Sequence, residues 1–371
     1  MTPDNSTNRS YQRRIAIGFS HWKSKNILPF LAVDPRQVVF VRNADEARAL
    51  EPRDGEDLIF WGSVAPPGIQ ELSEKTGAHL VRMEDGFVRS VGLGSDYVKP
   101  LSLVLDRKGI YFDPRQESDL EFMLNGADFS DEELSRARAV RAFIVDKGVT
   151  KYNTEPRELA DWASSGRQVV FVPGQVEDDA SIRFGCAGIN TNLGLLESAR
   201  CAHPDAFIVY KPHPDVMASN RKMGRVALDA ARRFADHIET SLSVVSCIEA
   251  CDVVHTMTSL TGFDALLRGK HVVVYGRPFY AGWGLTEDRL QVSRRSRKLS
   301  LDQLVAGALL RYPVYFDWEK MEFTTCESVL ERIVETRNAL EKTGDLDRLR
   351  IGYIRRKARR WLVRIKSWCK L

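Results

Sequence analysis

The sequence lacks any apolar run that approaches the roughly 20 residues needed to cross a bilayer. Its start, MTPDNSTNRSYQRR, is polar and contains no apolar stretch of the kind that forms a secretory signal. The six cysteines form no C-x-x-C pair and have no metal-type spacing, which predicts reduced, mostly buried thiols. No repeat with a period of about 20–50 residues indicates a solenoid. These absences predict a cytoplasmic protein made of ordinary globular domains.

What the chain does have is length and an uneven charge. Its 371 residues exceed the ~100–200 of a typical domain, and 43% hydrophobic with 28% charged residues is an ordinary globular composition. Nine Lys or Arg and no acid lie in residues 350–371, so subtracting them from the net charge of +4 leaves −5 for the rest. A strongly basic tail on a slightly acidic body predicts an anionic partner for the tail.

This basic tail has the pattern of an amphipathic helix. At about 100° per residue, its apolar side chains fall within one arc of about 120°, opposite the basic residues. Such a helix is typical of a membrane interface, where each Lys or Arg near an anionic leaflet contributes roughly 1 kcal/mol. A helix docked on its own protein is one alternative, and a nucleic-acid contact is another, although no motif elsewhere supports it. The apolar set is Ile354, Ala358, Trp361, Leu362, Ile365 and Trp368.

Short apolar runs alternate with helix-like segments along both halves of the chain, a pattern typical of parallel sheets covered on both faces. The first half has predicted strands at 14–19, 37–42, 57–62 and 79–84, with helices within 43–51 and 66–77 and near 117–124 and 131–147. The second half has strands at 168–173, 206–211, 252–257 and 271–276, with helices at 192–202, 226–237 and 261–269. Residues 101–113 are predicted to form a β-hairpin that turns at 107–109.

The predicted fold class is therefore α/β, with two Rossmann-like, doubly wound domains that face each other across a cleft. We expect a disordered N-terminus at 1–12, a first domain at 13–150 and a second domain at 151–320. A helical closing segment at 321–349 and the basic amphipathic helix at 350–371 follow.

Two segments that follow predicted strands suit an anion. Lys211 and His213, in KPHPD, are potential cationic donors whose flanking prolines restrict the backbone. In TSLTG, Thr258 or Ser259 can cap a helix whose first N–H groups would bind phosphate. An ordinary helix cap and a buried histidine are the alternatives, and neither segment is a P-loop or a G-x-G-x-x-G turn. The residues at the helix start are Ser259, Leu260, Thr261 and Gly262.

Carboxylates that follow two other strands suit a different task. Glu84 ends one predicted strand, and Glu177, Asp178 and Asp179 follow another. A sugar that reacts at its anomeric carbon passes through a cation-like transition state, which a close carboxylate stabilises or attacks. A metal site and a solvated loop are the alternatives for the three consecutive acids. Residues 276–288, GRPFYAGWGLTED, read either as a glycine-hinged aromatic lid or as a packed turn.

Taken together, these stretches resemble the KpsC-type capsule polysaccharide proteins of Gram-negative bacteria, which are β-Kdo transferases. The similarity covers roughly residues 14–320 in one order, and the chain carries a single module, most like the second of the two modules in that family. The matching stretches are RMEDGFVRSVGLG, PLSLVLDRKGIYFD, KYN, VPGQVEDDASIRFG, YKPHPDV, HTMTSLTGFDALLRGK and GRPFYAGWGLTED.

The resemblance implies a GT-B-like fold, CMP-β-Kdo as donor and retention of configuration at the anomeric carbon. In the family pattern a glutamine precedes the nucleophilic aspartate by four residues, which here selects Gln175 and Asp179, with Asp178 as contender. His213 would bind the CMP phosphate with Lys211 nearby, and Glu84 would be the base for the acceptor hydroxyl. Arg89 or Arg183 would hold the Kdo carboxylate, and Glu177 would lie beside the donor and tune Asp179. No metal or other cofactor is expected.

The function that we expect is transfer of Kdo to a lipid-linked acceptor, for example of the phosphatidylglycerol type, through a covalent carboxylate–Kdo intermediate. The first domain would hold the acceptor and the second the CMP-sugar. The protein would sit on the cytoplasmic face of the inner membrane, beside other capsule-assembly proteins and without nucleic acid. A GT-B-like transferase for another CMP- or UDP-sugar is the alternative enzyme, and a non-catalytic polysaccharide export component is the alternative of a different class.

Overall fold

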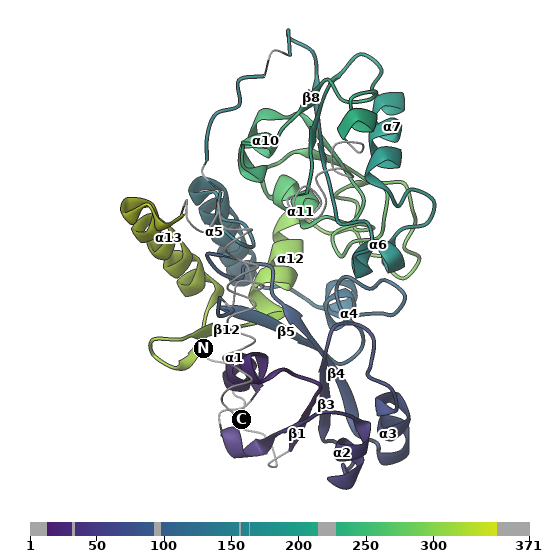
Figure 1. Ribbon diagram of the computed structural model, residues 1–371, viewed down its shortest axis with the longest axis vertical. Coiled ribbons are helices and arrows are strands. Elements are labelled where there is room, and N and C mark those ends of the chain that lie inside the picture. Colours follow the sequence, from purple (N-terminus) through teal and green to yellow (C-terminus); the bar gives the residue numbers. More distant parts are fainter. Residues whose placement is uncertain are drawn as a thin grey trace.

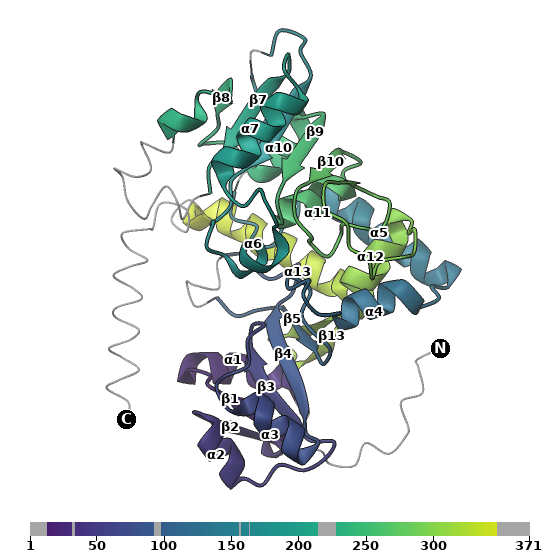
Figure 2. The same ribbon diagram turned by 90° about the vertical axis from the view of Figure 1, so that its right-hand side faces the viewer.

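The computed structural model describes residues 13–31, 34–92, 98–155, 157–162, 164–213 and 228–346. The predicted disordered start at 1–12 and the predicted amphipathic helix at 350–371 lie outside these residues. The described chain forms two α/β units, one above the other along the long axis, with α5, α12 and α13 beside the junction (Figures 1 and 2). No helix of the described part is both long enough and apolar enough to pass through a membrane.

The first unit is built on a seven-stranded sheet in the order β13-β12-β5-β4-β3-β1-β2. Strands β1 to β4 are mutually parallel, and apolar side chains such as Ile15 and Leu58 are fully buried between the sheet and its helices. The four strands predicted in the first half are thereby confirmed. Their bounds are β1 Arg14–Ile17, β2 Val38–Val41, β3 Asp57–Trp61 and β4 His79–Asp85, with helices α1 His21–Leu31, α2 Ala44–Ala49 and α3 Ile69–Thr76.

The predicted β-hairpin at 101–113 is wrong. Strand β5, Ser102–Asp106, pairs antiparallel with β4, and residues 110–113 form no strand. The cause is the buried Asp106 carboxylate, which accepts the backbone N–H groups of Lys108 and Gly109 at 3.0 and 2.7 Å. Its second oxygen accepts the backbone N–H of Asp119 at 2.9 Å and turns the chain toward the next helix. That helix, α4, spans Asp119–Gly126, and α5 spans Asp131–Lys147, as the sequence predicts within two residues.

The second unit is built on a six-stranded, fully parallel sheet in the order β11-β10-β9-β6-β7-β8. The chain starts at β6 and continues on one side with β7 and on the other with β9, so the topological switch point lies between β6 and β9. Ligands of open α/β sheets bind at the carboxyl ends of the strands flanking such a point. The strands are β6 Val169–Pro173, β7 Phe207–Lys211, β8 His237–Ile238, β9 Val253–Thr256, β10 His271–Val274 and β11 Glu287–Asp288. The helices are α6 Ala180–Gly185, α7 Asn192–Ala202, α10 Val244–Ala250 and α11 Leu260–Leu267.

The chain then returns to the first unit. After α12, Leu301–Val305, and a π-helical turn at Ala306–Arg311, strand β12 (Pro313–Asp317) pairs with β5 in the first sheet. The predicted second domain, 151–320, thus contains a strand of the first sheet. The segment predicted as a helical closure holds β13, Glu322–Thr324, and the long helix α13, Cys326–Thr343. One hydrophobic core joins residues of both units, including Val104 of β5 and Phe171 of β6.

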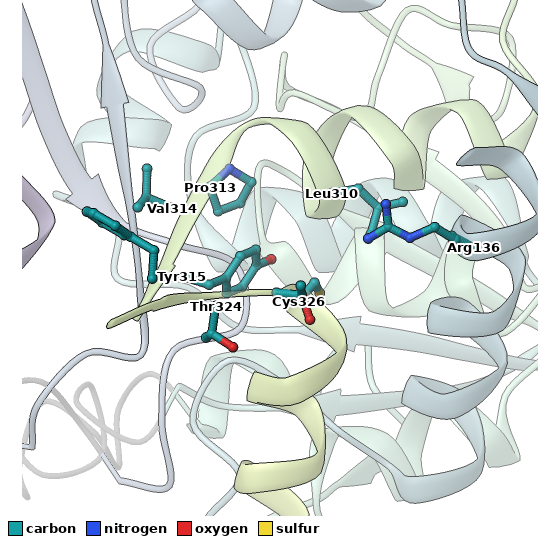
Figure 3. A pocket seen from close by; sticks show the side chains of 9 residues that line it. Arg136, Leu310, Pro313, Val314, Tyr315, Thr324 and Cys326 are labelled. Carbon is teal, nitrogen blue, oxygen red and sulfur yellow. The ribbon is translucent and has the colours of Figure 1, made fainter. Parts of the chain in front are cut away.

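A pocket of about 320 Å³ lies where the returning chain meets α5, and it contains none of the predicted site residues (Figure 3). Its wall combines the buried Tyr315 with Phe323, Cys326 and the guanidinium of Arg136. All five cysteines in the described ranges are free, and Cys247, Cys251 and Cys326 are buried.

Candidate active site

The loop that follows β6 is held from behind by Asn192, the first residue of α7. The Asn192 side chain accepts the backbone N–H of Gln175 at 2.8 Å and donates to the Gln175 carbonyl at 2.9 Å, as a neighbouring strand would. Its amide nitrogen and its backbone N–H also donate to the Glu177 carboxylate, at 3.0 and 2.7 Å. Gln175 is buried, and Glu177 is tied back to the loop. Asp178 and Asp179 follow on the exposed side.

Thr258, two residues after the end of β9, joins this loop to the other side of the switch point. Its backbone N–H donates to Gln175 Oε1 at 3.0 Å, and its hydroxyl accepts from Gln175 Nε2 at 3.1 Å. The same hydroxyl lies 3.0 Å from Ser181 Oγ, which donates to Asp179 Oδ1 at 2.6 Å. Asp179 also accepts the backbone N–H of Ser181 at 2.8 Å and caps α6. The sequence-predicted pair Gln175 and Asp179 therefore belongs to one hydrogen-bonded cluster.

The start of α11 lies beside this cluster. Ser259 caps the helix by accepting the N–H of Thr261 at 3.2 Å, and the Ser259 carbonyl accepts the N–H of Gly262 at 3.0 Å. The N–H groups of Thr261 and Gly262 thus have partners within the first turn of α11. The structure places all four predicted residues at the carboxyl edge of β9.

Gly262 has no room for a side chain. A Cβ there would lie 2.2 Å from the hydroxyl oxygen of Tyr280 and 2.7 Å from its ring carbon Cζ. Tyr280 is fully buried, and its hydroxyl donates to the Ser259 carbonyl at 2.5 Å. We expect Gly262→Ala to lower the free energy of unfolding by about 1–3 kcal/mol, because Tyr280 must move and lose this bond. Urea unfolding measures it.

Gly126→Ala is the matched control, since an added Cβ meets nothing within 4 Å at the end of α4. Its stability should be unchanged or higher, because alanine is the better helix former. Equal stability of Gly262→Ala and the wild type would contradict the close contact.

Lys211 ends β7, and His213 follows it at the same edge of the sheet. The buried Lys211 ammonium donates to the Leu242 carbonyl at 2.5 Å and lies 3.8 Å from the Glu155 carboxylate, so its charge faces these two groups. A Cβ at Gly174 would lie 2.9 Å from the backbone nitrogen of His213, so the absence of a side chain lets the two loops approach. His213 is thereby next to the loop that carries Gln175.

Glu84 lies at the end of β4 in the first unit, and Arg89 follows this strand. Arg89 is buried, and its Nε lies 2.8 Å from the Asp85 carboxylate; the guanidinium also donates to Ser90 Oγ at 2.9 Å and to the Val98 carbonyl at 3.1 Å. Arg89 is thus engaged within its own unit. Arg183, the alternative partner for a Kdo carboxylate, lies on α6 in the second unit.

The Glu84 carboxyl has an unusual titration. Burial and the neighbouring Asp85 charge raise its pKa to about 7, against the opposing influence of Lys151 and Lys23. Burial likewise lowers the pKa of Lys23 to about 8. An acid and a base whose pKa values approach neutrality from opposite sides are typical of sites that move protons.

Aromatic side chains pack the two units together next to the end of β4, which carries Glu84 and Asp85. Phe87, three residues after Glu84, has its ring centroid 4.4 Å from that of Phe279 and 6.2 Å from that of Phe263 in α11. The Arg115 guanidinium lies 3.5 Å from the ring centroid of Phe184 in α6. The loop after β4 therefore packs against α11 and Phe279, and the segment after β5 packs against α6.

The segment GRPFYAGWGLTED is a packed turn in the structure. Phe279, Tyr280 and Trp283 are buried, and the Trp283 indole N–H donates to the Phe279 carbonyl at 2.8 Å. Buried Arg295 donates to the carbonyls of Pro278 and Ala281, at 2.5 and 2.6 Å, and its guanidinium pairs with Glu121 of α4. Of the two readings that the sequence left open, the structure favours the turn.

Several residues of the site were not predicted. Asn192 reads in the sequence as an ordinary helix start, Ser181 as a loop residue, and Lys23 lies in helix α1, which the sequence analysis did not predict. Thr258 was predicted only as a helix cap. One signal was available for Asn192 and Thr258: each is a small polar residue at the carboxyl edge of the sheet, where ligands bind.

Two facing doubly wound units with polar residues at the switch point define a GT-B-like transferase fold. The chain belongs to the capsule polysaccharide biosynthesis protein family, whose model matches residues 56–316. It is similar to two solved chains of Thermosulfurimonas dismutans KpsC. The β-Kdo 2,7 transferase is 36% identical with a TM-score of 0.73, over 88% of this chain and 100% of that one. The β-Kdo 2,4 transferase is 29% identical with a TM-score of 0.75, over 88% and 98%.

Curated relatives are longer than this chain. It is 41% identical, over 90% of its length, to the capsule polysaccharide modification protein LipA of Neisseria meningitidis serogroup B, of which it covers 47%. It is 42% identical, over 70% of its length, to the lipopolysaccharide-processing protein LpsZ of Rhizobium meliloti, of which it covers 59%. The chain thus spans about half the length of the curated relatives it matches.

Proposed function

We propose that the protein is a retaining β-Kdo transferase of capsule polysaccharide biosynthesis that uses CMP-β-Kdo as donor. The observation that carries the proposal is the Asp179 carboxylate, presented at the switch point of the second sheet and bonded through Ser181 and Thr258 to the buried Gln175. The family membership and the likeness to two Kdo transferases support the choice of sugar.

In the first step, an oxygen of Asp179 forms a bond to the anomeric carbon of Kdo. The bond from that carbon to the phosphate oxygen breaks, and its electron pair leaves with CMP. The start of α11 and His213, on the neighbouring loop, would supply the positive potential that the departing phosphate needs. Lys211 adds positive potential without contacting the phosphate directly, because its ammonium already contacts the Leu242 carbonyl and the Glu155 carboxylate.

In the second step, a hydroxyl of the acceptor attacks the same carbon from the first unit. The bond to Asp179 breaks, and its electrons return to the carboxylate. The hydroxyl must lose a proton, and Glu84, whose pKa of about 7 suits a base at neutral pH, accepts it. Two displacements at one carbon restore the original configuration.

The acceptor and the location belong to the same proposal. We propose a lipid-linked acceptor, a basic tail that binds an anionic membrane surface, and action beside other capsule-assembly proteins. No metal is required, because the leaving phosphate has protein donors.

Incubation of the purified protein with CMP-Kdo and a Kdo-bearing lipid acceptor tests the proposal. We expect CMP release matched by Kdo addition, a β-linkage by NMR, and the same rate after treatment with EDTA. Transfer from another CMP- or UDP-sugar, with none from CMP-Kdo, would show that CMP-Kdo is not the donor. Binding of polysaccharide without any transfer would instead favour an export component, and loss of activity with EDTA that returns on adding a divalent cation would overturn the metal-free mechanism.

A further inference from the structure

We infer that the hydroxyl groups of Thr258 and Ser181 form a directed hydrogen-bond relay that positions the Asp179 carboxylate for attack. Both are positioning residues, because they act through Asp179. This role rests on the function proposed above. The relay connects the side chain of Gln175 to that of Asp179 through the hydroxyl groups of Thr258 and Ser181.

The direction of the relay follows from donor and acceptor chemistry. The backbone N–H of Thr258 can only donate, so the Gln175 atom that it meets at 3.0 Å is the amide oxygen. The amide nitrogen of Gln175 is then the atom 3.1 Å from Thr258 Oγ1, and it donates to that hydroxyl. The orientation of the Gln175 amide is therefore fixed at both ends.

The two hydroxyl protons are assigned in the same way. A carboxylate only accepts, so the single proton of the Ser181 hydroxyl goes to Asp179 Oδ1, 2.6 Å away. The contact of 3.0 Å between Ser181 and Thr258 then takes the proton of Thr258. Every donor points the same way, from the buried Gln175 to Asp179.

The relay leaves one oxygen of Asp179 for the sugar. Oδ1 accepts both the hydroxyl and the backbone N–H of Ser181, at 2.6 and 2.8 Å. Within the described ranges, Oδ2 makes no hydrogen bond. A carboxylate held at one oxygen has a fixed plane, and its second oxygen has a fixed direction. The neighbouring Asp178 is exposed, as Asp179 is. The relay reaches Asp179 and not Asp178, which selects Asp179 as the nucleophile.

The other end of the relay is anchored. Asn192 makes four hydrogen bonds to Gln175 and Glu177, between 2.7 and 3.0 Å long. Gln175, Asn192 and Thr258 are each at most 9% exposed. The β6 loop, α7 and the β9 loop thus meet at the buried side chain of Gln175. Through the relay, these three elements restrict the position of Asp179.

The test uses Thr258→Val, which is nearly isosteric and keeps the backbone N–H, and Ser181→Ala, which keeps its own. We expect each to lower kcat for Kdo transfer roughly 10- to 100-fold, the loss typical of a hydrogen bond to a charged group, with the KM for CMP-Kdo unchanged. Intact-mass measurement should show the covalent Kdo adduct forming correspondingly more slowly. Thr258→Ser, which restores the hydroxyl, should recover most of the rate.

The double variant distinguishes a relay from two separate structural contacts. A chain of hydrogen bonds is interrupted once, so the double variant should lose little more than the slower single variant. The control is Thr76→Val, which removes a hydroxyl bonded to the Leu72 carbonyl in α3 and should leave kcat unchanged. Full multiplication of the two single losses, failure of Thr258→Ser to recover, or wild-type kcat in Thr258→Val would each overturn the relay. Absence of transfer by the wild type would instead overturn the proposed function.

Discussion

Asp179→Asn should abolish Kdo transfer, with a loss of at least roughly a thousandfold, while the protein stays folded. The neutral amide cannot form the bond to the anomeric carbon. The local structure should survive, because asparagine caps helices as well as aspartate does, and its side-chain oxygen can keep the bonds to Ser181 that begin α6. Single-turnover CMP release measures the first displacement directly.

Asp178→Asn is the matched comparison, one residue away. This exposed carboxylate is outside the relay, so we expect the variant to retain most of its rate. Peptide mass spectrometry of the wild type with CMP-Kdo alone should locate the sugar on the peptide that contains Asp179. An adduct on Asp178, with activity lost in Asp178→Asn and kept in Asp179→Asn, would transfer the role to Asp178.

Glu84→Gln should lower kcat/KM roughly 100- to 10,000-fold and remove its dependence on pH near neutrality. In the wild type the raised pKa of Glu84, about 7, means that the base form is lost as the pH falls below this value. The rate should therefore climb with pH and level off above about 7. The first displacement needs no base, so the variant should still form the covalent adduct at close to the wild-type rate.

The pH dependence of the free energy of unfolding measures the raised pKa of Glu84 without any substrate. Its pKa is higher in the folded protein, about 7, than the ordinary 4.5, so between these values the folded state binds the proton more tightly than the unfolded chain. Glu84 thus lowers the free energy of unfolding as the pH rises through this window. Glu84→Gln should lack this decrease, whereas the control Glu71→Gln, at an exposed position on α3, should keep it. Matching pH profiles of stability in Glu84→Gln and the wild type would contradict the raised pKa.

Much of the fold could be predicted from periodicity alone. Eight apolar runs became β1–β4, β6, β7, β9 and β10, because a strand buried on both faces needs a continuous apolar run whatever its neighbours are. The hairpin at 101–113 failed for the opposite reason. Its outcome depended on the contacts of Asp106 with Asp119 and with the hydroxyl of Tyr312, 206 residues away, which no local pattern contains.

The residues of the candidate site also divide into those that the sequence predicts and those that it does not. The acids after β6 and β4 and the capped helix after β9 stand out because each follows an apolar run directly. Ser181 and Asn192 do not, since their importance comes from partners on other elements, 77 residues away for the contact with Thr258 and 17 for that with Gln175. Lys211 could be predicted to lie at the sheet edge, but not to face Leu242 and Glu155.

The sequence by itself determined eight of the buried strands, several of the helices that follow them and the chemical types gathered at the strand ends, because these depend on side chains close together in the chain. Only the tertiary structure decided which groups meet: Gln175 with Thr258, Phe87 with Phe279, and β12 with β5. The direction of the hydrogen bonds around Gln175 follows from such contacts, and the raised pKa of Glu84 follows from burial and from the charges near it. They depend on burial and distance, which exist only once the chain has folded.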